Sequence, residues 1–180
     1  MRIFIAINFQ DPWIEELTHT ISILQKHSLK GNFTRKDNLH LTVAFIGEVA
    51  GDRIDELIHT MKKVSFHPFI MELLDLGQFR YQGDVLYYRK VTCSKELTGY
   101  RSHLLEELKG ANFSVDEKEF VPHITLGRKC LMKEGFTDID FNQLLLSKSM
   151  IVHEICLMKS EQINGLLTYT KLYGRKAILE

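Results

Sequence analysis

The chain has 180 residues, 44% of them hydrophobic, and its 23 basic side chains balance 23 acidic ones. This length and apolar content favour one compact domain with a sizeable core, and the zero net charge argues against wholesale binding of polyanions. Three scattered cysteines argue against a disulfide scaffold and indicate a reducing, cytoplasmic compartment. We also expect no signal peptide, no membrane span and a monomer.

The first half of the chain predicts strand, helix, strand and helix in that order. Residues 2–8 form an apolar run typical of a strand. Asp11 followed by Pro12 predicts the start of a helix, because aspartate caps helices well and proline is tolerated at the first helical position. That helix is expected to end near His27. A strand is predicted over residues 39–46, and a helix follows with apolar residues spaced for one face, namely Ile54, Leu57, Ile58 and Met61.

The second half predicts a hairpin, a helix and further strands. Strands are expected over residues 69–79 and 85–92, joined by a turn. Ser94 predicts the cap of a helix that ends at Gly110, and Pro122 precedes another strand. Residues 131–147 are expected to form a loop with a short helix. Two final strands are predicted over residues 149–158 and 166–178.

Two short segments match each other: His40-Leu41-Thr42-Val43 and His123-Ile124-Thr125-Leu126. Composition alone predicts about 0.1 such segments by chance in a chain of this make-up. Side chains alternate between the faces of a strand, so the histidine and threonine of each segment share one face. Two such strands, brought together, would place two imidazoles and two hydroxyls around one ligand.

The surroundings of the two segments also repeat, at an offset of 83 residues (123 minus 40). Residues 3–5 fall on residues 86–88, and Asp11 falls on Ser94. The pattern indicates a strand–helix–strand unit that occurs twice, each copy ending in a histidine-x-threonine strand. We therefore predict an α+β fold with two lobes, in which two antiparallel sheets carry helices outside and one such strand faces the cleft from each sheet.

Paired imidazoles suit proton transfer at a phosphate. One ring can be protonated while the other is neutral near pH 7, so one can take a proton from water and the other can protonate a departing sugar oxygen. The threonine hydroxyls are suited to the non-bridging phosphate oxygens. This chemistry requires no metal or other cofactor.

Other interpretations stay open at this stage. Either segment could be an ordinary strand whose histidine is hydrogen-bonded near the core. Two histidines are too few for a closed zinc site, although a third ligand could come from elsewhere in the chain. The five basic pairs are expected to be mostly solvated surface charge; they are Arg35-Lys36, Lys62-Lys63, Arg89-Lys90, Arg128-Lys129 and Arg175-Lys176.

These residues resemble the two-histidine (2H) phosphoesterase superfamily, and in particular its RNA 2′,3′-cyclic phosphodiesterase branch, also called 2′-5′ RNA ligases. The similarity lies in the opening strand, the two motifs and the final strands: Arg2–Ile7, Asn38–Thr42, Phe45–Glu48, Pro122–Leu126 with Arg128, and Leu157–Ser160 with Tyr169. The resemblance implies a bilobal, pseudo-symmetric single domain over residues 1–180. It also implies metal-independent opening of a 2′,3′-cyclic phosphate at an RNA end to a 2′-phosphomonoester, with 2′-5′ ligation as the reverse reaction.

The resemblance assigns roles to particular residues. It implies that His123 is the base and His40 the acid, and that Thr42 and Thr125 grip the phosphate. Arg128 is a further expected phosphate ligand, although strict alternation would place it on the face opposite His123 unless the strand bulges.

Two features leave room for variation. Ala44 stands where the branch often has lysine, so one contact to phosphate or RNA would be missing or supplied elsewhere. Aromatic residues such as Phe9, Phe79 and Tyr81 could stack on a base. A non-catalytic module that binds RNA or nucleotides, or the same chemistry on a non-RNA cyclic phosphate, remain the alternative functions.

Overall fold

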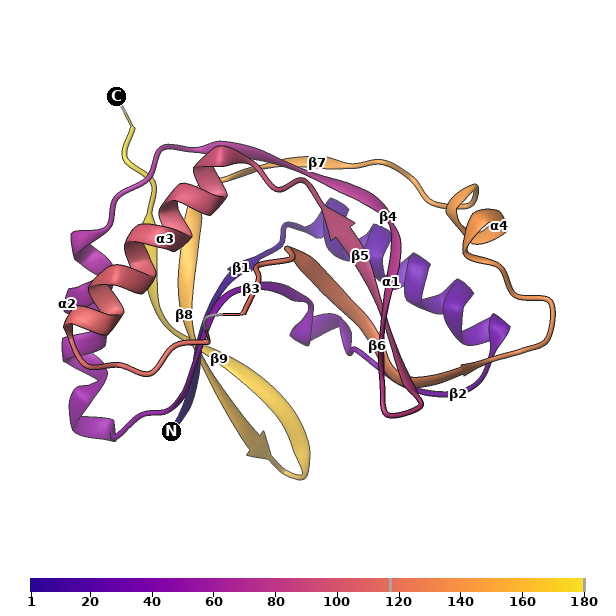
Figure 1. Cartoon of the computed structure of the whole chain (residues 1–180), viewed down its shortest axis with the longest axis horizontal. Coiled ribbons are helices and arrows are strands. Elements are labelled where there is room, and N and C mark those ends of the chain that lie inside the picture. The colour runs from indigo at the N-terminus through magenta and orange to yellow at the C-terminus, as the bar shows by residue number, and fades with distance from the viewer. Residues whose placement is uncertain (117, 180) are drawn as a thin grey trace.

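The computed structural model describes residues 1–116 and 118–179, without the side chains of residues 81, 139 and 140. The predicted stacking role of Tyr81 therefore lies outside the described residues. The described chain forms two antiparallel sheets with helices on the outside, which confirms the predicted α+β class (Figure 1).

The first sheet has four strands in the order β3-β1-β8-β9, each antiparallel to its neighbour. The strands are β1 (Arg2–Asn8), β3 (His40–Glu48), β8 (Glu154–Ile163) and β9 (Leu166–Lys176). The interior strand β1 is buried on both faces: Ile3, Ile5 and Ile7 join the main core, while Phe4 and Ala6 belong to a small cluster on the other face. This double burial explains why the run is continuously apolar instead of alternating.

The second sheet has five strands in the order β2-β6-β5-β4-β7, again antiparallel throughout. The strands are β2 (Ser28–Phe33), β4 (Phe69–Tyr81), β5 (Asp84–Val91), β6 (His123–Met132) and β7 (Ser149–Val152). The sequence did not predict β2, because Gly31 and Asn32 are typical of turns. Its pairing with β6 makes this segment a strand.

Residues 149–163 form two strands instead of the single strand predicted over residues 149–158. β7 pairs with β4 in the five-stranded sheet, whereas β8 pairs with β1 and β9 in the other. The chain crosses between the sheets at His153, which belongs to neither strand. A continuous apolar pattern does not reveal such a crossing, because both segments have a buried face.

Each copy of the repeated unit lends its helix to the other sheet. α1 (Asp11–His27) follows β1 but contacts β2 and β6, and α3 (Lys95–Gly110) follows β5 but contacts β3. α2 (Ile54–Lys63) packs beside α3 and against β9, and the short α4 (Asp138–Asn142) contacts β4 (Figure 1). Single 3₁₀ turns occupy Lys36–Asn38 and Gly51–Arg53. These contacts of α1 and α3 join the two lobes.

A buried ion pair joins α1 to the five-stranded sheet. Arg89 on β5 is 1% exposed, which corrects the expectation of surface charge for the first member of that basic pair. Its Nη1 lies 3.3 Å from Oε1 of Glu16, and its other donors bind the backbone oxygens of Leu74 and Leu146. The ion pair thus holds β5, the neighbour of β6, against α1, which belongs to the other repeat.

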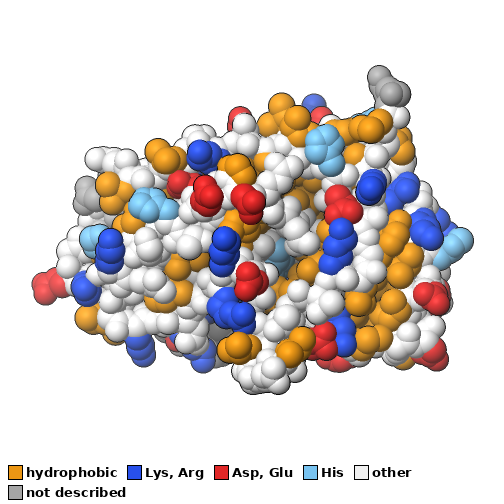
Figure 2. Space-filling view, turned by 180° about the vertical axis from the view of Figure 1, so that it is seen from behind, with side chains coloured by type: hydrophobic (Ala, Val, Ile, Leu, Met, Phe, Trp, Pro, Cys, Tyr) orange, Lys and Arg blue, Asp and Glu red, His pale blue; other side chains and the backbone are white. Residues whose placement is uncertain are grey.

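The surface carries charges of both signs. Figure 2 shows acidic and basic side chains interspersed over one face of the molecule, without a broad area of either sign. In the described part of the chain, no helix is long and apolar enough to cross a membrane. With zero net charge and mixed charges on the face in Figure 2, an anionic ligand is attracted by individual cations near its site and not by a broad basic surface.

Candidate active site

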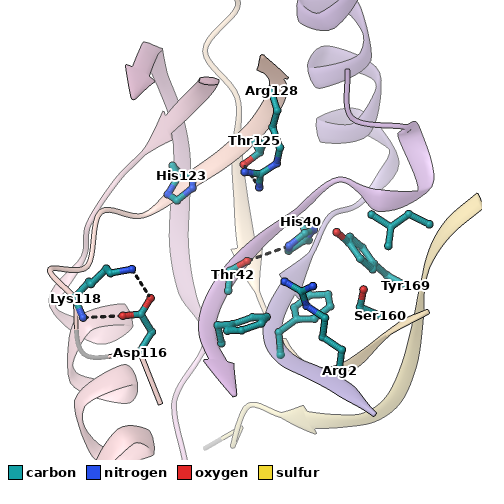
Figure 3. Close-up of a pocket in the computed structure, with 13 residues that line it drawn as sticks. Arg2, His40, Thr42, Asp116, Lys118, His123, Thr125, Arg128, Ser160 and Tyr169 are labelled. Atoms are coloured by element: carbon teal, nitrogen blue, oxygen red, sulfur yellow. Dashed lines mark hydrogen bonds and ion pairs between the residues drawn. The ribbon is translucent and has the colours of Figure 1, made fainter. Parts of the chain in front are cut away.

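The two motif strands, β3 and β6, contact each other where the sheets meet. Between them lies a cleft of about 670 Å³. Its lining includes all five predicted site residues: His40, Thr42, His123, Thr125 and Arg128 (Figure 3). A smaller space of about 230 Å³ beside it shares His40, Thr125 and Arg128. The fold thus brings together the side chains singled out from the sequence, although the two motifs lie 83 residues apart.

A bulge in each motif strand determines which residues face the cleft. In β6, Thr125 lies opposite Tyr88 and Gly127 lies opposite Tyr87, so Leu126 is an extra residue. The extra residue reverses the alternation beyond it, and Arg128 therefore lies on the same side as Thr125. The sequence required a bulge for Arg128 to reach the cleft, and β6 has that bulge.

The corresponding bulge in β3 is at Val43, because Thr42 lies opposite Ala6 and Ala44 opposite Ile5. Ala44 is 4% exposed and belongs to the main core, so the position where relatives often carry lysine does not line the cleft in this chain. Phe45 lines it instead. Phe45 is the counterpart of Arg128 in the repeat, since both follow the motif threonine by three residues.

Both imidazoles are anchored in the same way. Nδ1 of His40 lies 2.7 Å from the backbone oxygen of Asn38, and Nδ1 of His123 lies 2.7 Å from that of Val121. A carbonyl oxygen only accepts hydrogen bonds, so each neutral ring carries its proton on Nδ1 and presents an unprotonated Nε2. The Nε2 of His40 lies 3.0 Å from the hydroxyl of Thr42, which donates to it when the ring is neutral. Each ring is therefore oriented to exchange protons through Nε2.

Each imidazole also has two aromatic neighbours from other strands of its own sheet. The ring of His40 contacts Phe4 and Tyr169, with centroids 4.9 and 5.1 Å away. The ring of His123 contacts Tyr88 and Phe79 at 5.2 and 5.3 Å. These walls fix the orientation of the imidazoles and exclude water from one side of each.

The environment lowers the pKa of both histidines. Burial is the main cause for each ring, because it disfavours the charged form, and the positive charge of Arg128 lowers the pKa of both further. The hydrogen bonds from Nδ1 to the backbone act in the opposite direction without cancelling the shift. Near pH 7 both rings of the free protein are therefore predominantly neutral.

The second aromatic wall depends on one glycine. The ring of Tyr88 lies across Gly77 of the neighbouring strand, where an added Cβ would meet the ring at 2.4 to 2.7 Å. Phe79 stacks on the same ring, with centroids 4.4 Å apart. Sequence comparison of the two repeats matched Phe4 with Tyr87, but strand pairing differs by one residue, so Tyr88 faces His123 and Tyr87 lies in the core.

Of the aromatic residues predicted to stack on a base, the two with described side chains behave differently. Phe79 contacts His123 and supports it, whereas Phe9 packs on Trp13 with ring centroids 5.3 Å apart. The sequence also assigned no site role to several other residues that line the cleft, including Arg2, Lys118 and Ser160. No local pattern marks them as site residues, because only the meeting of the lobes places them there.

Among the described residues, no group of three or more histidine, cysteine, aspartate or glutamate side chains is placed to hold a metal ion. His40 and His123 are thus not joined by a third ligand of these types in the described chain. The predicted site residues bring two imidazoles, two hydroxyls and the Arg128 guanidinium to the cleft. This donor set suits an anion more than a cation.

Comparisons with known proteins agree with this geometry. The chain is 33% identical over 131 residues to an RNA 2′,3′-cyclic phosphodiesterase of Thermotoga maritima, covering 71% of this chain and 70% of that protein. It is 28% identical over 153 residues to an RNA 2′,3′-cyclic phosphodiesterase of Methanocaldococcus jannaschii, covering 79% and 85%. The crystal structure of E. coli LigT complexed with 3′-AMP has a TM-score of 0.76 and 25% identity, covering 99% and 98% of the two chains. Residues 9–164 match the sequence profile of the 2′-5′ RNA ligase superfamily. The chain belongs to this superfamily, the 2H phosphoesterases.

Proposed function

We propose that the protein hydrolyses 2′,3′-cyclic phosphate ends of RNA to 2′-phosphomonoesters, with His40 and His123 as its acid–base pair. The observation that carries this proposal is the convergence of two Nδ1-anchored imidazoles, one from each sheet, on a single cleft. The relatives named RNA 2′,3′-cyclic phosphodiesterase support the substrate class, as does the 3′-AMP in the LigT structure.

In the proposed reaction, neutral His123 accepts a proton from the water that attacks phosphorus. As the new P–O bond forms, the bond from phosphorus to the 3′ oxygen breaks, and His40 gives its Nε2 proton to that oxygen. The phosphate stays on the 2′ oxygen. The order of roles is supported by access to water, because His40 is the more deeply buried of the two rings. With a 5′-hydroxyl in place of water, the same exchange forms a 2′-5′ linkage.

The required protonation state arises when substrate binds. In the free protein the pKa of His40 is below its usual value. A phosphodiester anion beside the ring favours its charged form, so binding is coupled to uptake of a proton. Protonated Nε2 of His40 no longer accepts from Thr42, so the hydroxyl hydrogen of Thr42 is then free for a phosphate oxygen.

The remaining donors are placed to bind the phosphate. Nη2 of Arg128 lies 3.5 Å from the hydroxyl oxygen of Thr125, so the guanidinium and the hydroxyl approach the cleft together. Both donate to anionic oxygens, and charge-assisted bonds of this kind stabilise the negative charge that develops at phosphorus.

Product identification tests the proposal. The protein is incubated in EDTA with an oligonucleotide that ends in a 2′,3′-cyclic phosphate, and the product is resolved by phosphorus NMR. We expect a 2′-phosphomonoester. Affinity without turnover would show a binding module, and loss of turnover in EDTA would show a metal enzyme. A non-RNA cyclic phosphate turned over much faster than the oligonucleotide would identify a different substrate class.

We further propose that the protein works as a monomer in the cytoplasm. All the donor groups described above come from one copy of the chain. Light scattering at the concentration of the activity assay checks this, and an activity that falls on dilution in step with dissociation of a dimer would contradict it.

A further inference from the structure

Arg2 is a cation in the cleft that the proposed reaction does not use. It lies on β1, is exposed, and lines the same cleft as the two histidines (Figure 3). Its guanidinium carbon lies 5.2 Å from the centre of the Phe45 ring. Among the described residues no carboxylate lies within ion-pair distance of it. A guanidinium held by an aromatic face with its donors unused is suited to bind an anion.

The other cations of the cleft have partners within the protein. Lys118 lies 3.6 Å from the carboxylate of Asp116, which also accepts from the Lys118 backbone (Figure 3). Arg128 contacts Thr125 at the proposed phosphate site. In the repeat, Phe45 occupies the position of Arg128, and Arg2 stacks on Phe45. Each lobe thus contributes one guanidinium to the cleft. Arg128 comes from the motif strand β6, and Arg2 comes from β1, the neighbour of the motif strand β3.

Strand geometry places Arg2 beyond the reacting phosphate. Phe4 contacts His40, and Arg2 precedes Phe4 by two residues on the same face of β1. Two residues of a strand span about 6.8 Å. This step runs from the aromatic neighbour of His40 to Arg2, so Arg2 lies in the same cleft but away from the ring of His40. The phosphodiester on the 5′ side is the next anion of an RNA end, and a guanidinium at this place in the cleft is suited to bind it.

We propose that Arg2 binds the phosphodiester on the 5′ side of the terminal nucleotide, so that the protein prefers oligonucleotide ends over cyclic mononucleotides. This inference rests on the proposed function and adds a specificity-determining residue to it. Arg2 does not take part in the proton transfers. Its contribution is one charge-assisted contact that a mononucleotide lacks.

The test compares wild type with Arg2→Gln on two dinucleotides that end in a 2′,3′-cyclic phosphate. One has a natural phosphodiester between its nucleotides, and the other has a neutral methylphosphonate there. We expect Arg2→Gln to lower kcat/KM for the natural dinucleotide about 10-fold or more, mainly through KM. We expect its kcat/KM for the neutral dinucleotide to equal that of wild type, which also shows that the variant is folded.

One control variant and the pattern of losses separate the possible outcomes. Arg80→Gln removes the same charge from an exposed strand position outside the cleft and should change neither rate. An equal loss on both dinucleotides would place Arg2 at the reacting phosphate and overturn the inference, and so would no loss on either. If wild type turns over neither dinucleotide nor a cyclic mononucleotide, the proposed function fails on its own terms.

Discussion

Replacing Glu16 by glutamine should destabilise the protein strongly, because it removes the ion-pair partner of the buried Arg89 guanidinium. Oε1 of Glu16 accepts from Arg89 at 3.3 Å and from the Leu146 backbone at 3.2 Å, and the two side chains are 3% and 1% exposed. Removing one partner of such a pair costs about 3–5 kcal/mol. For a protein of this size, each kcal/mol lowers Tm by about 2–4 °C, so the total shift is roughly 6–20 °C.

Urea denaturation followed by circular dichroism measures the loss of unfolding free energy. Glu15→Gln is the matched control, because Glu15 is the exposed neighbour on the same helix and its loss should change stability by less than about 0.5 kcal/mol. The double variant Glu16→Leu with Arg89→Met should recover much of the stability, since apolar replacement of a buried pair is often neutral. A loss below about 1 kcal/mol for Glu16→Gln would refute the argument that Arg89 needs this countercharge.

Three further predictions concern activity. His40→Ala and His123→Ala should each lower kcat by at least about 100-fold with unchanged circular dichroism, and near-wild-type turnover by either would remove that ring from the mechanism. The profile of kcat/KM against pH should be bell-shaped, because the active form has one protonated and one neutral ring. Its maximum should lie below about pH 6.5, because burial lowers the pKa of both histidines from 6.5 in the free protein. A maximum above pH 8 would contradict this. Gly77→Ala should lower kcat more than it raises KM, because the new methyl group displaces Tyr88 from beneath His123; an unchanged kcat, measured at saturating substrate, would show that this aromatic wall does not position the ring.

The chemistry of the candidate site could be predicted from local pattern. A histidine and a threonine two residues apart share a strand face in any sheet, so His40 with Thr42 and His123 with Thr125 needed no tertiary information to be paired. The repeat around them indicated two lobes, and the structure has one motif strand in each sheet.

Other features depended on partners that are distant in sequence. β2 is a strand only because β6 lies beside it, and the crossing at His153 follows from pairing with two different sheets. Arg89 belongs to a basic pair that looks like solvated charge, and the helix exchanged between the repeats buries it. Local sequence carries no record of such contacts, because each is decided by which surface covers the segment.

The sequence by itself determined the candidate reacting groups of this protein: two imidazoles and two hydroxyls on two equivalent strands. Only the tertiary structure decided their setting, which comprises the bulges that bring Arg128 and Phe45 to the cleft, the carbonyls that fix both rings at Nδ1, and the position of Arg2. The physical reason is that side-chain type and alternation are properties of one strand. Register, burial and approach depend on the strands and helices that pack against it.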